Sequence, residues 1–502
     1  MPASVSARPE SALLEQLKNR WSREPLQHFI DNRWVENSTR ETFEVVNPAT
    51  EERLAVCASG GKAEIDRAVS AARKAFESGP YRKWSGRDRG KFLRRLADLV
   101  EKHAEELAAL ECLNNGKPIA ELRAVDLPMT VEVLHYYSGW ADKVHGETIQ
   151  PPGNYFVYTR REPMGVCGSI TAWNFPLLLT SWKFGPAIAG GNTMVHKPPE
   201  QAPLSSLRFA ELCREAGLPD GVFNVVTGLG ETAGEALTRH PDVDKVGFTG
   251  HYQTGQLVMK AAAESNLKRV SLELGGKSPN IILDDADLDL AVRGTLTGIF
   301  FNQGEVCCAG SRLFLPKKLH DPFLDRLVSA ANARKVGDPL DPKTEQGAQI
   351  SQEQFDKILG YIEKGKAEGA KLASGGARCG ERGYFVRPTI FDGVKDEMAI
   401  AREEIFGPVI SVLPYESLDE VAQRANATCY GLGAAVFTQN VQKAHHLAAK
   451  LKSGTVWINC YNAFDASVPF GGYKMSGFGR ELGQHALELY TQVKAVWLNL
   501  GP

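Results

Sequence analysis

Apolar and polar residues follow a helical spacing through the first third of the chain. In segment 64–76, apolar residues recur every three or four positions, as on the buried face of a helix. Similar patterns extend over about 87–113 and 119–144. The first strand pattern follows at 155–161, where YFVYTRR alternates between the two residue classes. We therefore expect several long helices before the first strand of this region.

From residue 165 onward, short apolar runs alternate with helical patterns. The strand-like runs of the first series cover 165–171, 192–197, 222–226, 244–248 and 269–274. A second alternating series extends from about 280 to 458. Strands separated by helices of ~10–15 residues indicate βαβ units with parallel sheets. Because no low-complexity linker separates the two series, we expect two α/β units with a ligand-binding cleft between them.

The C-terminal segment VKAVWLNL, at 493–500, has the pattern of an apolar strand. An exposed strand edge of this kind promotes association unless another element covers it. A second copy of the chain would cover that edge. Alternatively, the segment is an edge strand of its own domain.

Composition and charge argue against nucleic acid and membranes as partners. The chain has 502 residues, is 43% hydrophobic and 24% charged, and carries a formal net charge of −2. Nucleic acids and anionic membranes favour proteins with a basic excess. No apolar run reaches the ~18–20 residues of a membrane span, and the N-terminal segment lacks the apolar core of a secretory signal. The expected compartment is the cytoplasm.

The nine cysteines show neither a disulfide pattern nor a zinc pattern. Their irregular spacing in a long chain favours a reducing compartment, and we expect no structural metal. One pair is adjacent: FFNQGEVCCAGSR, at 300–312, contains Cys307 and Cys308. Either both thiols are packing residues, or one is a nucleophile that requires partners from elsewhere in the chain.

Two polar residues near the ends of predicted strands are candidate partners for a thiol. Asn174, in ITAWNFP, could donate an N–H to a developing oxyanion, or it could cap a turn before Pro176. Glu273, in SLELGGKSP, stands between two leucines. Apolar surroundings would raise the pKa of its carboxyl and suit a general base, although most glutamates face solvent.

Two glycine clusters follow predicted strands and precede predicted helices. GLGETAG contains Gly230 and Gly234, and FTGHYQTG contains Gly250 and Gly255. A helix N-terminus offers free N–H groups and partial positive charge to a pyrophosphate, whereas ordinary tight turns also use glycine.

A third strand of the first series ends in HKPPEQ, at 196–201. The segment provides Lys197 and, three residues later, Glu200. A carboxylate at this point of a Rossmann-like sheet accepts the ribose hydroxyls of NAD and repels the 2′-phosphate of NADP, although a solvated turn would have the same composition. Together, a thiol, a carboxamide, a carboxylate and a dinucleotide site are the groups needed to oxidise an aldehyde through a thioester.

The order of these motifs resembles that of the aldehyde dehydrogenase superfamily, specifically its NAD-dependent, hydrolytic branch. The similarity covers about 29–497. It is carried by ITAWNFPLLL, HKPPEQ, GFTGHYQTG, LELGGKSPNI, FNQGEVCCAGSR, EEIFGPV and PFGGYKMSGFGRELG. The resemblance implies a Rossmann-like NAD-binding domain (1–140 and 164–275), a catalytic α/β domain (276–475) and a small β oligomerisation element (141–163 and 476–502). Homodimers or homotetramers are usual in this family.

The resemblance also implies roles for individual residues. The nucleophile falls on Cys307, the general base on Glu273 and the oxyanion amide on Asn174, with the Cys307 backbone N–H as second donor. Lys183 resembles a lysine near the catalytic asparagine. Cofactor contacts fall on Lys197 and Glu200 (adenosine ribose), on Glu404 and Phe406 (nicotinamide ribose and ring), and on Ile170, Trp173, Gly230, Gly234, Phe248, Gly250, His251, Gly255, Leu274 and Gly275. Positions of the family's substrate tunnel fall on Phe175, Trp182, Phe301, Phe464 and Phe470.

Two departures from the family pattern concern the site. His251 stands where the family commonly has serine, which removes a small hydroxyl from the pyrophosphate site. Glu305 replaces a common glutamine, and its carboxylate would raise the pKa of the nucleophile if it were close. We expect it to point away.

The implied function is NAD-dependent oxidation of an aldehyde to the carboxylate, by way of a thiohemiacetal and a thioester on Cys307. Glu273 would then activate the water that hydrolyses the thioester. Three alternatives are an enzyme that passes the acyl group to coenzyme A, a cysteine esterase without redox chemistry, and a non-enzymatic use of the same scaffold. The identity of the aldehyde does not follow from the sequence.

Overall fold

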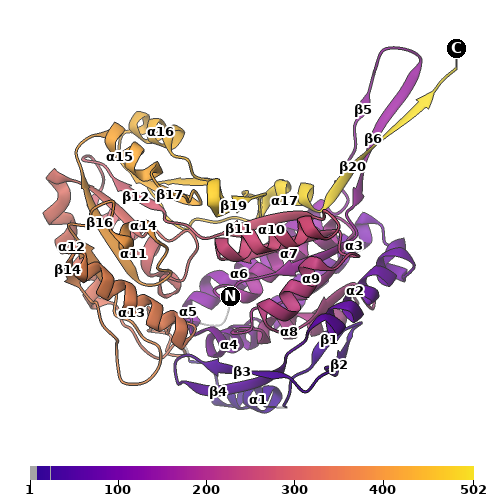
Figure 1. Cartoon of the computed structure of the whole chain (residues 1–502), viewed down its shortest axis with the longest axis horizontal. Helices are drawn as coiled ribbons and strands as arrows, with labels where there is room; N and C mark the ends of the chain where they lie inside the picture. Colours follow the sequence, from indigo (N-terminus) through magenta and orange to yellow (C-terminus); the bar gives the residue numbers. More distant parts are fainter. Residues whose placement is uncertain (1–7, 23, 502) are drawn as a thin grey trace.

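A computed structural model describes residues 8–22 and 24–501. Two α/β units lie side by side in it, and a long β arm projects from the first unit (Figure 1). The sheet of the first unit has eight strands in the order β19-β11-β10-β7-β8-β9-β1-β2. Its parallel strands are β7 (Val166–Ile170), β8 (Thr193–Lys197), β9 (Phe223–Val225), β10 (Lys245–Gly250) and β11 (Arg269–Leu274). Antiparallel strands flank them: β1 (His28–Ile30), β2 (Arg33–Val35) and β19 (Gly477–Phe478).

The parallel strands of the first sheet are almost entirely buried because helices connect them. These helices are α7 (Pro176–Ala189), α8 (Leu204–Glu215), α9 (Glu235–Arg239) and α10 (Tyr252–Glu264). The expected alternation of strands and helices in this region is therefore confirmed. Earlier helices add to the unit: α1 (Ser11–Trp21), α2 (Lys62–Glu77), α3 (Gly86–Lys102), α4 (Ala104–Asn115) and α6 (Leu127–Trp140).

The two longest predicted helices are each interrupted. The pattern over 87–113 divides at His103 into α3 and α4. The pattern over 119–144 contains the short helix α5 (Ile119–Glu121), then a π-helical turn at Leu122–Asp126, and then α6. Hydrophobic periodicity does not reveal either break, because the apolar face continues through it.

The second unit contains a seven-stranded sheet in the order β14-β15-β16-β13-β12-β17-β18. Its strands are β12 (Pro279–Ile282), β13 (Arg312–Pro316), β14 (Lys371–Ser374), β15 (Thr389–Asp392), β16 (Val409–Tyr415), β17 (Gly433–Phe437) and β18 (Thr455–Ile458). All neighbouring pairs are parallel except β14 with β15. The helices are α11 (Leu288–Phe300), α12 (His320–Ala333), α13 (Gln352–Ala367), α14 (Ala399–Arg402), α15 (Leu418–Asn426) and α16 (Val441–Lys450).

The C-terminal strand β20 (Thr491–Asn499) joins the projecting arm. It pairs antiparallel with β6 (Tyr155–Pro163), which pairs in turn with β5 (Thr148–Ile149). β20 is therefore an edge strand, and its second edge is open in the single chain. The segment before it belongs elsewhere, because β19 pairs with β11 and α17 (Gly483–Leu489) packs against α7. Of the described residues from 476 onward, β19 and α17 thus pack on the first unit, whereas β20 lies in the arm.

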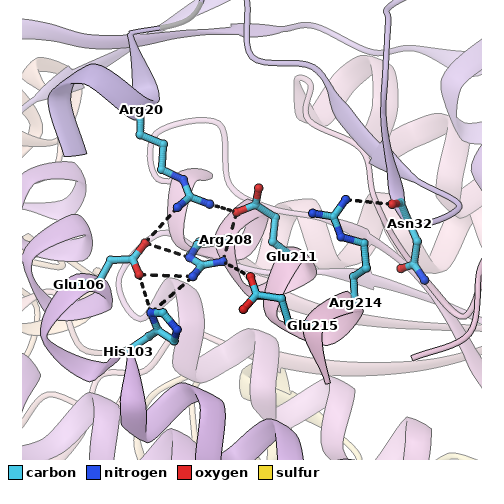
Figure 2. Close-up of polar contacts among 8 residues, drawn as sticks. All are labelled: Arg20, Asn32, His103, Glu106, Arg208, Glu211, Arg214 and Glu215. Carbon is cyan, nitrogen blue, oxygen red and sulfur yellow. Dashed lines mark hydrogen bonds and ion pairs between the residues drawn. The ribbon is translucent and has the colours of Figure 1, made fainter. Parts of the chain in front are cut away.

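The N-terminal helix α1 is attached to the first unit by an ion-pair network (Figure 2). Arg208 of α8 donates to Glu106 at 2.9 Å and to Glu215 at 2.9 Å. Arg20 of α1 pairs with Glu106 and with Glu211. A two-stranded sheet of β3 (Thr42–Asn47) and β4 (Glu52–Ala58) lies in the same N-terminal region. In the described ranges, no helix combines the length and the apolar character of a membrane span.

Candidate active site

The parallel strands of the first sheet bring three predicted site segments to one edge. In neighbouring strands, Thr249 pairs in register with Glu273, and Phe248 pairs with Ile170. Because the carboxyl ends of parallel strands meet at the same sheet edge, Glu273 lies near the segment that follows β7 and carries Asn174.

The second unit contributes the loop with the two adjacent cysteines. This loop follows α11 and passes close to the glycines after β11. A side chain at Gly276 would place its Cβ 2.6 Å from the carbonyl oxygen of Cys307. The backbone approach that brings the thiol loop beside β11 therefore requires glycine at this position.

A cavity of about 600 Å³ lies where the two units meet. The predicted residues that line it are Trp173, Asn174, Phe175, Trp182, Gly250, His251, Glu273, Leu274, Gly275, Phe301, Cys307, Glu404, Phe406, Phe464 and Phe470. The proposed thiol, amide and carboxylate thus face one space, although they are up to 133 positions apart in the chain.

The side-chain amide of Asn174 is fixed by the thiol loop. Its Nδ2 donates to the carbonyl oxygen of Glu305 at 3.0 Å. A carboxamide nitrogen has two N–H groups, so one remains for a ligand in the cavity. This arrangement suits stabilisation of an oxyanion near Cys307.

The two cysteines differ in their surroundings. Cys307 is half-buried, whereas Cys308 is fully buried and its Sγ lies 3.5 Å from Oδ1 of Asn462. The Cys308 thiol, burial and the charge of Glu273 raise the pKa of Cys307 well above its ordinary value. A positive charge nearby would be needed to favour the thiolate.

Glu273 is a buried carboxylate. Its side chain is 2% exposed, and neither carboxylate oxygen meets a conventional hydrogen-bond partner among the described residues. Burial raises the pKa of its carboxyl to about 7, and the neighbouring Cys307 thiol and Lys183 ammonium oppose that shift. A carboxyl that titrates near neutral pH is suited to accept a proton from water.

Lys183 does not line the cavity but lies immediately behind it. Its ammonium donates to Thr249 Oγ1 at 2.7 Å and to Glu481 Oε1 at 2.9 Å. The Lys183 and Glu481 side chains are both buried, so the charge of each one stabilises the charge of the other. Sequence reasoning missed Glu481, which stands in the motif FGRELG without any pattern that marks it.

The residues predicted for the adenosine end lie along the same sheet edge but outside the cavity. Lys197 Nζ donates to Glu200 Oε2 at 2.6 Å, at the end of β8. His251, in contrast, lines the cavity and caps α10, since the backbone N–H of Gln253 donates to its Nδ1 at 3.4 Å. The predicted residues that do not line the cavity are Ile170, Lys183, Lys197, Glu200, Gly230, Gly234, Phe248 and Gly255.

The loop after α14 brings Glu404 and Phe406 to the cavity. Glu404 Oε1 accepts a hydrogen bond from the backbone N–H of Gly276 at 2.9 Å. A Cβ at Gly275 would lie 2.2 Å from the same carboxylate, so a larger residue there would displace the Glu404 side chain from this position. The rings of Phe406 and Trp173 meet edge to face at 5.2 Å.

Further lining residues were not predicted from the sequence, among them Gln354 and Lys357 of α13. Gln354 Nε2 donates to the carbonyl oxygens of Ile405, at 3.1 Å, and Phe406, at 2.6 Å. Because these residues sit on an ordinary amphipathic helix, only the folded structure shows that one turn of it faces the cavity.

Two groups of aromatic rings line the cavity. Trp182, Phe464 and Phe470 pack together, with ring centroids 5.1 to 6.2 Å apart. Phe175 stacks on Phe301 at 6.2 Å. All five predicted tunnel residues therefore lie together on one ligand-accessible space.

Glu305 points away from the nucleophile, as expected. Its Oε1 accepts a hydrogen bond from the backbone N–H of Ile350 at 3.0 Å, and its Oε2 accepts one from Gln303 Nε2 at 3.2 Å. The groups that raise the pKa of Cys307 do not include this carboxylate. The glutamate that replaces the common glutamine is therefore held by these two hydrogen bonds, with its carboxylate directed away from the thiol.

Fold and site together define a two-unit α/β protein with a thiol, an amide and a carboxylate on one cavity. Comparison with known proteins agrees with this class. The aldehyde dehydrogenase family model matches residues 34–496. The mitochondrial aldehyde dehydrogenase of Homo sapiens is 55% identical over 471 residues, 94% of this chain and 91% of that protein. A putative aldehyde dehydrogenase of Bacillus subtilis is 53% identical over 472 residues, 94% and 95% of the two chains.

Solved structures show the same similarity. The NAD+ complex of an aldehyde dehydrogenase from Bacillus cereus has a TM-score of 0.96 and 50% identity, and covers 99% of this chain and 100% of that one. The indole-3-acetaldehyde dehydrogenase of P. syringae has a TM-score of 0.94 and 44% identity, with coverages of 97% and 99%. The chain belongs to the aldehyde dehydrogenase family. The predicted family, fold class and enzyme class are confirmed, and so are NAD-dependent aldehyde oxidation and NAD as the cofactor.

Proposed function

We propose that this chain oxidises an uncharged, apolar aldehyde to the carboxylate with NAD, through a thioester on Cys307. The observation that carries the proposal is the convergence of the Cys307 thiol, the Asn174 amide and the Glu273 carboxylate on one cavity. The NAD+ complexes of solved relatives support the choice of cofactor.

The residues present fit a dinucleotide. We assign the first unit to NAD binding, with Lys197 and Glu200 at the adenosine ribose and the N-terminus of α10 at the pyrophosphate. Glu404 Oε2 has no hydrogen bond from Gly276, whose N–H uses Oε1, so it is available to a ribose hydroxyl at the nicotinamide end. The negative charge of Glu200 favours NAD over NADP.

The second unit supplies the nucleophile. Cys307 attacks the aldehyde carbonyl as a thiolate after releasing its proton to solvent water, so Glu273 stays ionised for the later step. The free N–H of Asn174 and the backbone N–H of Cys307 donate to the resulting oxyanion, and such a donor is typically worth about 3–4 kcal/mol. Bound NAD supplies the hydride acceptor. Glu273 then takes a proton from a water molecule, which attacks the thioester and releases the carboxylate and the free thiol.

The lining of the cavity supports an uncharged substrate. Lining residues from 125–182, 297–301 and 462–470 carry no formal charge, and most of them are aromatic or aliphatic. A charged aldehyde would lose its hydration there without a compensating partner. Aliphatic and aromatic aldehydes therefore fit better than cationic or anionic ones.

The direct experiment is a mixing assay. Purified protein, NAD and a panel of aldehydes are combined, and NADH is followed by absorbance. We expect turnover without coenzyme A, the highest kcat/KM for apolar aldehydes and little activity with NADP. A requirement for coenzyme A would instead identify an acylating enzyme, and ester hydrolysis without any NADH would identify a plain esterase.

The β arm supports assembly into a homodimer or homotetramer. Exposed apolar side chains cluster on it: Ile149, Tyr155, Phe156, Val493, Trp497, Leu498 and Leu500. An open strand edge beside such a patch favours pairing with another copy. Light scattering after size exclusion should give a multiple of 54.9 kDa, and V493K with L498K should shift the species toward the monomer.

The cytoplasm is the proposed compartment. All nine cysteines are unpaired, as in a reducing environment. The mammalian relatives are named as mitochondrial proteins, so fractionation of cells that express the full chain distinguishes the two compartments.

A further inference from the structure

The turn that precedes Cys307 is held in an unfavourable backbone conformation. Asn302, Gln303 and Gly304 have φ values of 48°, 45° and 79°, so three successive residues are left-handed. For a residue other than glycine, this conformation costs of order 1–3 kcal/mol and persists only where surrounding contacts enforce it. The position of the thiol loop thus depends on the groups that bind this turn.

The carboxyl of Glu121 binds the first residue of the turn. The backbone N–H of Asn302 donates to Glu121 Oε2 at 2.9 Å, across 181 positions of sequence. Glu121 ends α5, immediately before the π-helical turn at Leu122–Asp126. Burial raises the pKa of its carboxyl to about 8, and Lys117 opposes the shift. A neutral carboxyl still accepts this bond through its carbonyl oxygen.

The side chain of Asn302 then joins the two halves of the site. Its Nδ2 donates to the carbonyl oxygen of Asn174 at 2.9 Å and to that of Glu305 at 3.2 Å. The side chain of Asn174 donates to the same Glu305 oxygen at 3.0 Å. Asn302 therefore fixes the segment that carries the oxyanion amide against the backbone two residues before Cys307.

The region around Glu121 contacts the Asn174 segment at other points as well. Asn115 Nδ2 donates to the carbonyl oxygen of Trp173 at 2.6 Å, and the backbone N–H of Leu177 donates to Glu111 Oε1 at 2.7 Å. The ammonium of Lys117 lies 3.7 Å from the centroid of the Phe175 ring. Segment 111–121 thus supports Asn174 from one side and the thiol loop from the other.

We propose that Glu121 is a positioning residue for the reaction: through the backbone and the carboxamide of Asn302, it sets the spacing between the Asn174 amide and the Cys307 sulfur. The inference rests on the proposed roles of Asn174 and Cys307. An error of about 1 Å in such a spacing can lower the rate about 100-fold, so a residue that touches no reactant can still control kcat.

The test compares Glu121→Ala, Glu121→Gln and Asn302→Gly, with Glu132→Ala as an exposed control on α6. We expect E121A to lower kcat about 10- to 100-fold without changing KM for NAD. E121Q retains an acceptor oxygen and should restore most of kcat. N302G keeps the left-handed turn without strain but loses the carboxamide, so kcat should fall while the melting temperature holds.

The rate of alkylation by iodoacetamide distinguishes a displaced Asn174 amide from a general loss of structure at the site. The reaction needs the Cys307 sulfur and no oxyanion donor, so its rate in N302G should match the wild type. If E121A or N302G has wild-type kcat, or if E121Q is as impaired as E121A, the proposal is wrong. If E121A does not fold, Glu121→Asp, whose carboxylate is one methylene shorter, takes its place, and wild-type kcat in E121D would contradict the proposal. Full NADH production by Cys307→Ala would instead overturn the proposed function.

Discussion

The side-chain amide of Asn174 donates a hydrogen bond of 3.0 Å to the carbonyl oxygen of Glu305. Asn174 follows β7 of the first unit, and Glu305 precedes the thiol in the second unit, 131 positions later. The bond therefore links the two units at the wall of the cavity. It also orients the amide, because one of the two N–H groups is engaged and the other is left for a ligand in the cavity that Cys307 also lines.

Asn174→Ala should lower kcat by about 100- to 1,000-fold, the usual cost of one oxyanion donor. The substitution leaves the Glu305 oxygen with its second donor, Asn302, so the fold should persist. Steady-state kinetics beside a thermal melt will show both effects, with the exposed Asn19→Ala as control. Activity near the wild-type level in N174A would remove the amide from the mechanism.

The adjacent cysteines should behave differently when each is replaced. Cys307 is half-buried, whereas Cys308 is fully buried beneath it. Cys307→Ala should abolish NADH production, because no other thiol on the cavity wall is exposed. Cys308→Ala should retain most of the activity, with a small loss of stability from the missing sulfur. The assignment of the nucleophile is wrong if C308A is inactive and C307A is active.

Thioester hydrolysis should depend on the protonation of Glu273. Burial raises the pKa of this carboxyl to about 7, so below that value the base form declines about tenfold per pH unit. The steady-state rate after the first turnover should therefore rise with pH and level off above about 7. Glu273→Gln should remove this dependence, and an unchanged pH profile in E273Q would assign the titration to another group.

The same pKa shift has a consequence for stability. A carboxyl whose pKa is raised in the folded state contributes stability at low pH and loses it as the pH rises through the folded value. The melting temperature of the wild type should therefore fall between about pH 4.5 and pH 7 relative to that of E273Q, and level off above that range. Parallel melting curves across this range would contradict the raised pKa.

Removal of the central arginine in Figure 2 should destabilise the N-terminal region. Arg208 is 3% exposed and bonds to Glu106, Glu211 and Glu215. Arg208→Met removes the buried guanidinium from all three carboxylates and leaves Arg20 as a partner of Glu106 and Glu211, which should cost about 2 kcal/mol, the scale of lost hydrogen bonds to charged groups. The melting temperature should drop by several degrees, with kcat unchanged.

Arg214, six residues further along α8, provides the matched control. It is more exposed and donates to the carbonyl oxygen of Asn32 at 3.2 Å. Arg214→Met should lower the melting temperature much less, since it leaves no buried charge without a partner. Equal melting temperatures for R208M and the wild type would show that the network adds nothing to stability.

Much of the fold was predictable because hydrophobic patterns and motifs are local. The segment RVSLEL reads as a buried strand, and β11 has those bounds. Asn174, Glu273 and Cys307 each stand in a short motif, so they could be identified without coordinates. The breaks at His103 and at Leu122–Asp126 were missed, because the helical periodicity continues across them.

The supporting residues of the site were not predictable in the same way. Glu121, Gln354 and Glu481 act through hydrogen bonds to residues more than 50 positions away. No local pattern marks a carboxyl or an amide that will meet a distant backbone group. Such contacts depend on how the two sheets are placed against each other, which appears only in the folded chain.

The central claim is that the acyl group is bound to the Cys307 sulfur as a thioester, and that Glu273 then activates the water that hydrolyses it. The most direct measurement is mass spectrometry of E273Q mixed rapidly with NAD and an apolar aldehyde. We predict a burst of one NADH per active site, together with the mass of one acyl group on the peptide that contains Cys307. An acyl group on a different residue, or a burst with no covalent adduct, would contradict the account.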